Sequence, residues 1–216
     1  VYDAPIQTSG AALKWFIETM AAEEQQYAKE HDKNIYTYLN ELALESKPGA
    51  GGVFFFPYLL GERAPLWNEY ARGMFIGMGM DMKRSDLIRS VFEGTAYALR
   101  HVMETVKASG AKAKVLRICG GGAKSPLWRE ILANVLGIPL TLPQTEQGPG
   151  YGGAMLAAVA CGAYPSVQAC AKALVHAKST TQPDAALVEK YNARYAVWRK
   201  LYPALKVSFA EMEALQ

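Results

Sequence analysis

The longest regular alternation of apolar and polar positions lies between residues 84 and 109. Apolar side chains recur there every three or four residues for about seven turns, which is the spacing of an amphipathic helix. They are Leu87, Ile88, Val91, Phe92, Leu99, Val102, Met103 and Val106. Ser85 is placed to cap the start of this helix and Gly110 to end it, so the pattern predicts a helix over residues 84–109.

Shorter helical patterns and short apolar runs share the rest of the chain. Helical spacing predicts helices over residues 11–28, 34–46, 126–136, 166–177 and 184–202, and an Ala-rich helix that ends at residue 161. Runs of β-forming residues predict strands over residues 1–7, 53–57, 73–78, 115–118 and 140–142. This alternation is typical of an α/β fold in which helices flank a mixed sheet.

Composition and charge narrow the class of protein. The 216 residues are 50% hydrophobic and 20% charged, which predicts one globular domain over residues 1–216. The net charge of +3 is spread along the chain without a basic stripe, so we expect no nucleic-acid partner. We see no run that could span a bilayer and no secretory signal, so we expect a cytoplasmic protein without a membrane partner.

Cysteine and histidine residues give no sign of a metal site. Cys119, Cys161 and Cys170 lack paired spacing, and the three histidines stand apart from one another. Zinc needs three or four converging ligands, so we expect reduced thiols and no bound metal among these side chains.

Two glycine-rich segments suggest a nucleotide cleft. Three consecutive glycines follow the strand expected at residues 115–118, and their backbone can approach a ligand without interference from a Cβ atom. Ser125 and Pro126 then begin a helix, whose N-terminus attracts phosphate. Residues 147–153 also lie between a strand and a helix. In α/β sheets such segments gather at one edge, so we expect the two to lie side by side.

One alternative assigns the same glycines to a different cofactor. Gly120, Gly122 and Ser125 nearly match the dinucleotide fingerprint, and Glu146 stands where a ribose-binding acid would be. The third glycine of that fingerprint is missing, and a long helix and two strands precede it. A Rossmann-like NAD-binding domain therefore stays as the alternative interpretation.

Three motifs resemble the FGGY carbohydrate kinases. Residues Gly73–Met78, Asp86-Leu87 and Ser90–Gly94 resemble the second signature of this family at each specified position. The runs Pro57–Pro65 and Gly120–Trp128 are similar to its pentulose and gluconate kinases. The resemblance extends from about residue 10 to residue 198. It implies the C-terminal lobe of a two-lobed kinase, with the actin-like ATPase (ribonuclease H-like) fold.

The resemblance also implies an activity and a set of nucleotide-binding residues. Such kinases transfer the γ-phosphoryl group of ATP, with Mg²⁺, to a sugar hydroxyl, and D-xylulose is favoured here over gluconate. Gly10, Gly121 and Gly122 match glycines that bind the nucleotide. Lys14 falls where some relatives carry a glutamine that reaches it.

Pro126 departs from the pattern of one branch of the family. Pro126 stands where glycerol kinases carry an asparagine that contacts the nucleotide, so Ser125 is the nearest polar substitute. Trp128 could flank the adenine, but its helical spacing favours core packing.

The catalytic base is expected outside this sequence. In the family, the catalytic Asp, the first phosphate hairpin and most sugar contacts belong to an N-terminal lobe that we expect to be absent here. We therefore assign no catalytic and no metal-binding residue, and we expect the isolated chain to be inactive. A homodimer and a non-catalytic actin-like module remain open.

Overall fold

The computed structural model describes residues 4–145 and 148–215, and it confirms the α/β class with a mixed sheet. The early elements are α1 (Gly10–Met20), α2 (Ala22–Glu30), α3 (Ile35–Glu45), the 3₁₀ turn η1 (Ala50–Gly52), β1 (Phe54–Phe56) and β2 (Met74–Ile76). The later elements are α4 (Arg84–Ala108), β3 (Leu116–Arg117), η2 (Gly121–Lys124), α5 (Pro126–Leu136), β4 (Leu140–Pro143), α6 (Gly148–Ala160), α7 (Val167–Leu174), β5 (Ala177–Thr181) and α8 (Ala185–Glu213).

The strands form two small sheets. β1 and β2 are antiparallel, with Phe55 opposite Phe75. In the second sheet β4 lies in the middle, parallel to β3 and antiparallel to β5. Among the described residues β3 is therefore an edge strand.

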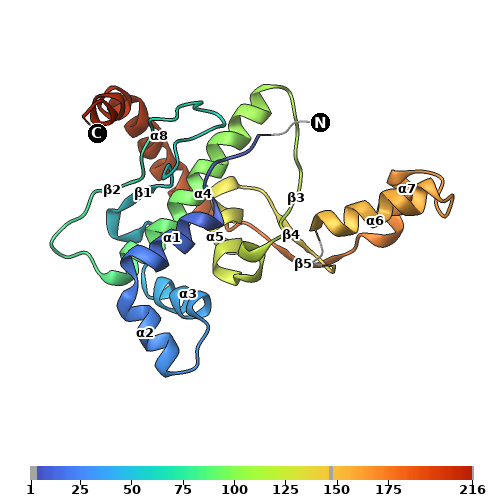
Figure 1. Cartoon of the computed structure of the whole chain (residues 1–216), viewed down its shortest axis with the longest axis horizontal. Helices are drawn as coiled ribbons and strands as arrows, with labels where there is room; N and C mark the ends of the chain where they lie inside the picture. The colour runs from blue at the N-terminus through green and yellow to red at the C-terminus, as the bar shows by residue number, and fades with distance from the viewer. Residues whose placement is uncertain (1–3, 146–147, 216) are drawn as a thin grey trace.

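Helix α4 lies at the centre, and α1, α3, α5, α8 and β1 pack against it (Figure 1). Its Gly94 lies against β1 so closely that a Cβ atom there would overlap the carbonyl oxygen of Phe55. The same oxygen accepts a hydrogen bond from Nε1 of Trp198 in α8, at 3.0 Å. The ring of Trp198 also stacks on Phe56, with 4.5 Å between centroids. One carbonyl thus joins α4, β1 and α8.

A buried ion pair also joins α4 to α8. Nε of Arg89 lies 2.7 Å from Oε1 of Glu93, and their side chains are 5% and 1% exposed. The hydroxyl of Tyr191 donates to the same Glu93 oxygen at 2.9 Å and accepts from Arg89 at 3.1 Å. The backbone N–H of Gly49 donates to it as well. Burial, reinforced by the charge of Glu93, raises the pKa of Tyr191, so its hydroxyl remains a donor.

Two helices differ from their predicted extents because of tertiary contacts. The helix expected over residues 11–28 is broken at Ala21, where Arg84 of α4 binds both the Met20 carbonyl oxygen and the Glu24 carboxylate. Helix α8 continues past Pro203, where the pattern predicted its end. Beyond that proline, Phe209 is buried and stacks on Tyr202, so packing compensates for the lost hydrogen bond.

Other differences are local. Lys83, not Ser85, caps α4, and its N–H donates to the Asp86 carboxylate at 3.0 Å. Strand β5 was missed because it is mostly exposed and lacks apolar alternation. Residues 4–7 form no strand, and residues 1–3 lie outside the described part.

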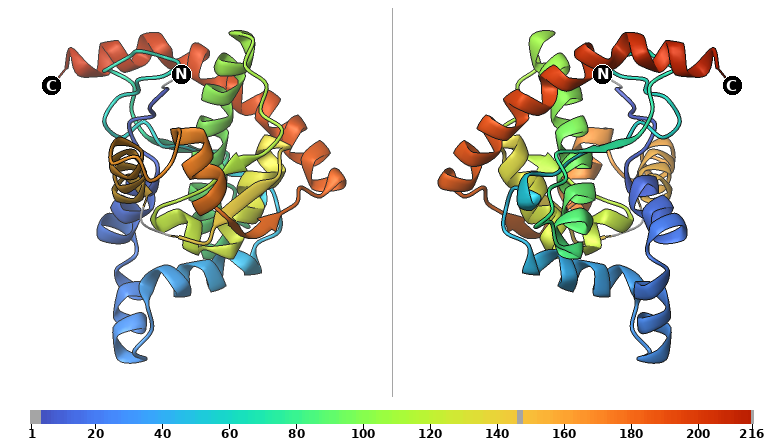
Figure 2. Two further views of the ribbon diagram at one scale, coloured as in Figure 1. Left: turned by 90° about the vertical axis from the view of Figure 1, so that its right-hand side faces the viewer. Right: turned by 90° about the vertical axis from the view of Figure 1, so that its left-hand side faces the viewer.

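Helices α6 and α7 project as an arm from the body (Figure 1). No residue of α6 is buried, although the helix is rich in apolar residues. Views from both sides show α2 extending from the body as well, whereas α3 runs along the body against α4 (Figure 2). None of the helices in the described part is long and apolar enough to cross a membrane.

We predict that Arg89→Met lowers the free energy of unfolding by about 3–5 kcal/mol, because it leaves the buried Glu93 carboxylate without its countercharge. The double variant Arg89→Met/Glu93→Leu should recover most of this loss, since no charge is then buried. Urea unfolding of the three proteins measures both effects.

The matched control is Lys14→Met, which breaks an exposed pair of the same i,i+4 spacing. It should change the free energy of unfolding by no more than about 0.5 kcal/mol. A loss for Arg89→Met as small as that of the control would contradict the assigned importance of the buried pair.

Candidate nucleotide-binding site

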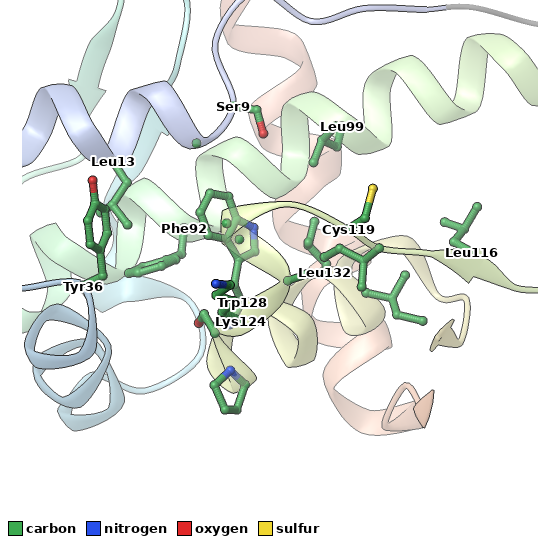
Figure 3. A pocket seen from close by; sticks show the side chains of 18 of the residues that line it. Ser9, Leu13, Tyr36, Phe92, Leu99, Leu116, Cys119, Lys124, Trp128 and Leu132 are labelled. Atoms are coloured by element: carbon green, nitrogen blue, oxygen red, sulfur yellow. Dashed lines mark hydrogen bonds between the residues drawn. The ribbon is translucent and has the colours of Figure 1, made fainter. Parts of the chain in front are cut away.

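A cleft of about 1060 Å³ lies between α1, α3, α4, α5 and β3. One end is polar and is formed by the starts of three helices and the glycine loop after β3. The other end is apolar and is formed by α4, α5, β3 and the first residue of β4. Figure 3 shows the two ends meeting around Phe92 and Trp128.

The N-termini of three helices meet at the polar end. Ser9 and Gly10 begin α1, Asn34 caps α3, and Ser125 caps α5. Each N-terminus carries a partial positive charge from the helix dipole and backbone N–H groups that lack helical partners. Together they suit an anionic ligand such as a phosphate group.

The glycine loop presents bare backbone to the cleft. Gly120 has a φ of 83°, which favours glycine and turns the chain out of β3. A Cβ atom on Gly121 would meet nothing within 4 Å, and one on Gly122 would lie 3.4 Å from the Trp128 ring. A flat or phosphate-bearing ligand can therefore approach this backbone closely.

Ser125 holds the loop to α3. Its Oγ accepts a hydrogen bond from the Trp128 N–H at 2.9 Å, which is the predicted cap of α5. The same hydroxyl is hydrogen-bonded to Oδ1 of Asn40, whose side-chain amide donates to the Tyr36 carbonyl oxygen. Because the Ser125 hydroxyl makes both of these hydrogen bonds, Ser125 holds the glycine loop against α3 and also lines the cleft.

Trp128 belongs to the core beneath the loop. Trp128 is 5% exposed, and its ring packs edge-to-face on Phe92 with 5.3 Å between the ring centroids. This is the packing that the helical spacing favoured. The indole N–H has no hydrogen-bond partner among the described residues.

All six residues predicted for nucleotide binding line the cleft, namely Gly10, Lys14, Gly121, Gly122, Ser125 and Pro126. Lys14 lies at the rim, where its ammonium group is 3.6 Å from the Glu18 carboxylate and largely exposed. It is thus available to move toward a ligand. The binding role of the six residues remains a prediction.

The second glycine-rich segment is not part of this cleft. Its described residues, 148–153, do not line it, so the two segments do not form one cleft within the described part. Glu146 and Gln147 lie outside the described residues.

Asn34, Tyr36 and Asn40 were missed as site residues although they line the cleft. One of them could have been found from the sequence. Asn34 stands at the predicted start of a helix, where a capping residue is expected.

Nowhere in residues 4–145 and 148–215 do three His, Cys, Asp or Glu side chains gather in a way that could hold a metal ion. Magnesium in phosphoryl-transfer sites is held by one or two carboxylates together with phosphates of the nucleotide, so we assign no step to a metal held by these residues alone.

Comparison with known families identifies the chain. Residues 1–161 match the model of the C-terminal domain of the FGGY family of carbohydrate kinases. The chain belongs to this family. Membership disfavours the NAD-binding alternative, because the family's activity is phosphoryl transfer to carbohydrates.

Individual relatives point to the same group of kinases. The chain is 32% identical to a xylulose kinase of Lactococcus lactis over 90% of its length and 37% of that protein. It is 31% identical to a gluconokinase of Bacillus subtilis over 78% of its length and 33% of that protein. The solved xylulose kinase of Rhodospirillum rubrum, 30% identical, superposes with a TM-score of 0.80 over 95% of this chain and 40% of that one.

The chain spans about two fifths of the length of the curated relatives that it matches. Its likeness to these kinases shows the actin-like ATPase fold of the family's C-terminal domain.

We predict that Ser125→Ala lowers the free energy of unfolding by about 1 kcal/mol, since it removes the cap of α5 and the link to Asn40. Ser125→Thr retains the hydroxyl oxygen, so its free energy of unfolding should stay within about 0.5 kcal/mol of that of the unsubstituted protein. Urea unfolding measures both variants, and equal losses for the two would contradict the role given to the hydroxyl.

Proposed function

We propose that this chain forms the adenine-nucleotide side of a carbohydrate kinase active site. The complete enzyme would phosphorylate D-xylulose with ATP, and gluconate is the second candidate substrate. The observation that supports this most directly is the meeting of three helix N-termini with the bare glycine loop in one cleft. Xylulose kinases and gluconokinases among the relatives support the choice of sugars.

The cleft can bind ATP through both of its chemical properties. Apolar surface around Phe92 and Trp128 suits the flat base, and backbone N–H groups at the helix starts suit the phosphates. Phosphoryl transfer depends mainly on positioning and on neutralising charge. Residues 1–216 would thus act as one lobe that holds and orients the nucleotide.

The base that deprotonates the sugar hydroxyl is assigned to the part of the kinase that these residues do not include. Closure of the two lobes over the substrates would exclude water and limit hydrolysis of ATP. Mg²⁺ would arrive bound to the ATP phosphates and contribute positive charge there.

We predict that Gly121→Leu in the complete kinase raises the KM for ATP at least tenfold and leaves the KM for the sugar within twofold. The new side chain would enter open space in the cleft without a clash that disturbs folding. Steady-state kinetics with each substrate varied in turn measure this split.

Gly153→Leu is the matched control, because a Cβ there also meets nothing within 4 Å but the residue does not line the cleft. It should leave both KM values unchanged. If Gly121→Leu changed neither value, the assignment of the glycine loop to the nucleotide would be wrong.

We predict that the complete kinase phosphorylates D-xylulose with a higher kcat/KM than gluconate, and that the 216-residue chain alone phosphorylates neither. A coupled assay for ADP release measures both. Turnover by the isolated chain would refute the assignment of the base to another part. Absence of activity in the complete protein with every sugar tested would indicate a non-catalytic module instead.

A further inference from the structure

A second hollow lies between α4 and α8, apart from the nucleotide-binding cleft. Helix α8 runs across α4 (Figure 2), and the two helices together line this hollow of about 620 Å³. Its volume is within the range for small-molecule sites, which is about 300–1,000 Å³. The lining residues are Arg100, Glu104, Asn192, Tyr195, Ala196, Arg199, Lys200 and Pro203. None of them lines the cleft, so the hollow is a separate place for a ligand.

Positive charge exceeds negative charge in this hollow. Its cations are Arg100, Arg199 and Lys200, and Glu104 is the one acidic residue among the described residues that line it. Three cations against one carboxylate leave a formal excess of two positive charges. The buried ion pair of α4 is balanced one to one, whereas this cluster is not. A ligand that carries two negative charges would balance it.

Glu104 holds both guanidinium groups in place. Its Oε2 accepts hydrogen bonds from Arg199 and from the Tyr195 hydroxyl, both at 3.0 Å. Its Oε1 lies 3.3 Å from Nε of Arg100. The guanidinium group of Arg100 also lies over the Tyr195 ring, 4.2 Å from the centroid, and donates to Asn192 at 2.7 Å. Side chains that are held before a ligand arrives lose less conformational entropy when it binds.

Several donors remain for a ligand. Arg199 gives one terminal nitrogen to Glu104, and its Nε and other terminal nitrogen have no partner in the described part. The same holds there for one terminal nitrogen of Arg100 and for the ammonium group of Lys200. A guanidinium group presents parallel N–H groups that match two oxygens of a phosphate. The Arg199 side chain is 57% exposed, so it is free to turn toward such a group.

We propose that this hollow binds a phosphate group, either free or carried by a small ester. Such a group carries about two negative charges at neutral pH, which matches the excess in the hollow. Its oxygens accept hydrogen bonds from Arg199 and Arg100, and Lys200 adds a third positive charge. The carbon skeleton of an ester lies against Ala196 and Pro203. The site does not depend on the role proposed for the cleft, because the two share no lining residue.

A purely structural role for the cluster fits less well. Arg100 alone already pairs with Glu104 at i,i+4 spacing, so Arg199 brings a second positive charge to the same carboxylate. The effect of that charge is felt by a neighbour. Burial lowers the pKa of His101, and the charge of Arg199 lowers it further, by more than Glu104 raises it. A bound anion would relieve the repulsion between these cations.

Isothermal titration calorimetry of the complete kinase, with inorganic phosphate and with D-xylulose 5-phosphate, tests the proposal at constant ionic strength. Each ligand should show a binding event that Arg199→Gln weakens at least about tenfold, because the variant removes the guanidinium fork. Phosphate that binds in the nucleotide cleft binds equally to both proteins. Failure of the proposed ATP role would therefore neither imitate nor hide this difference.

Lys206→Gln is the matched control, because it removes one positive charge about two turns further along α8 from a residue that does not line the hollow. It should leave both affinities within about twofold. Both variants should melt within about 2 °C of the unsubstituted protein, since both side chains are exposed. Equal weakening by the two variants, or none by Arg199→Gln, would overturn the proposal.

The two ligands distinguish the sources of the phosphate group. Tighter binding of D-xylulose 5-phosphate than of inorganic phosphate, lost in Arg199→Gln, would assign the hollow to an organic phosphate whose carbon skeleton contacts Ala196 and Pro203. Equal affinities for the two ligands, again lost in that variant, would assign it to free phosphate.

Discussion

The close approach of α4 to β1 at Gly94 is the constraint on which the rest of the structure depends. No side chain fits between the helix and the Phe55 carbonyl oxygen, so the backbones themselves are in contact. This contact places the adjacent Glu93 at the buried ion pair with Arg89 and Tyr191. It also places Phe92 in the wall of the cleft. Three consecutive residues of α4, Phe92, Glu93 and Gly94, thus act through the position of one helix.

Under the proposed function, the cleft would attract phosphate through backbone groups as well as through the charged side chains that line it, Lys14, Arg117 and Lys124. Three helix N-termini and a glycine loop contribute backbone N–H groups, while Lys14 remains at the rim beside Glu18. Backbone groups are held rigidly by the fold, so they need little reorganisation when a phosphate binds. The apolar half of the same cleft suits the flat base of a nucleotide, so a single hollow combines walls of two kinds.

Much of the fold could be predicted from the sequence because its strongest signals are local. The period of apolar residues predicted α3, α4 and α5, and Ser125 and Gly137 lie at the ends of α5 as expected. All six proposed site residues line one cleft, because the glycine loop and the helix starts have local signatures. The exposed β5 had no such signature, since its residues are polar and their partner strand lies about 40 positions earlier in the chain.

By itself the sequence determined the class of fold, the family and the glycine loop that lines the cleft. Only the tertiary structure decided where α1 ends, because Arg84 binds the Met20 carbonyl from 64 residues away. It alone joined Asn40 to Ser125, and it separated the second glycine segment from the cleft. The physical reason is the same in each case: periodicity and capping report contacts between near neighbours, whereas these features depend on groups that meet only when distant segments pack.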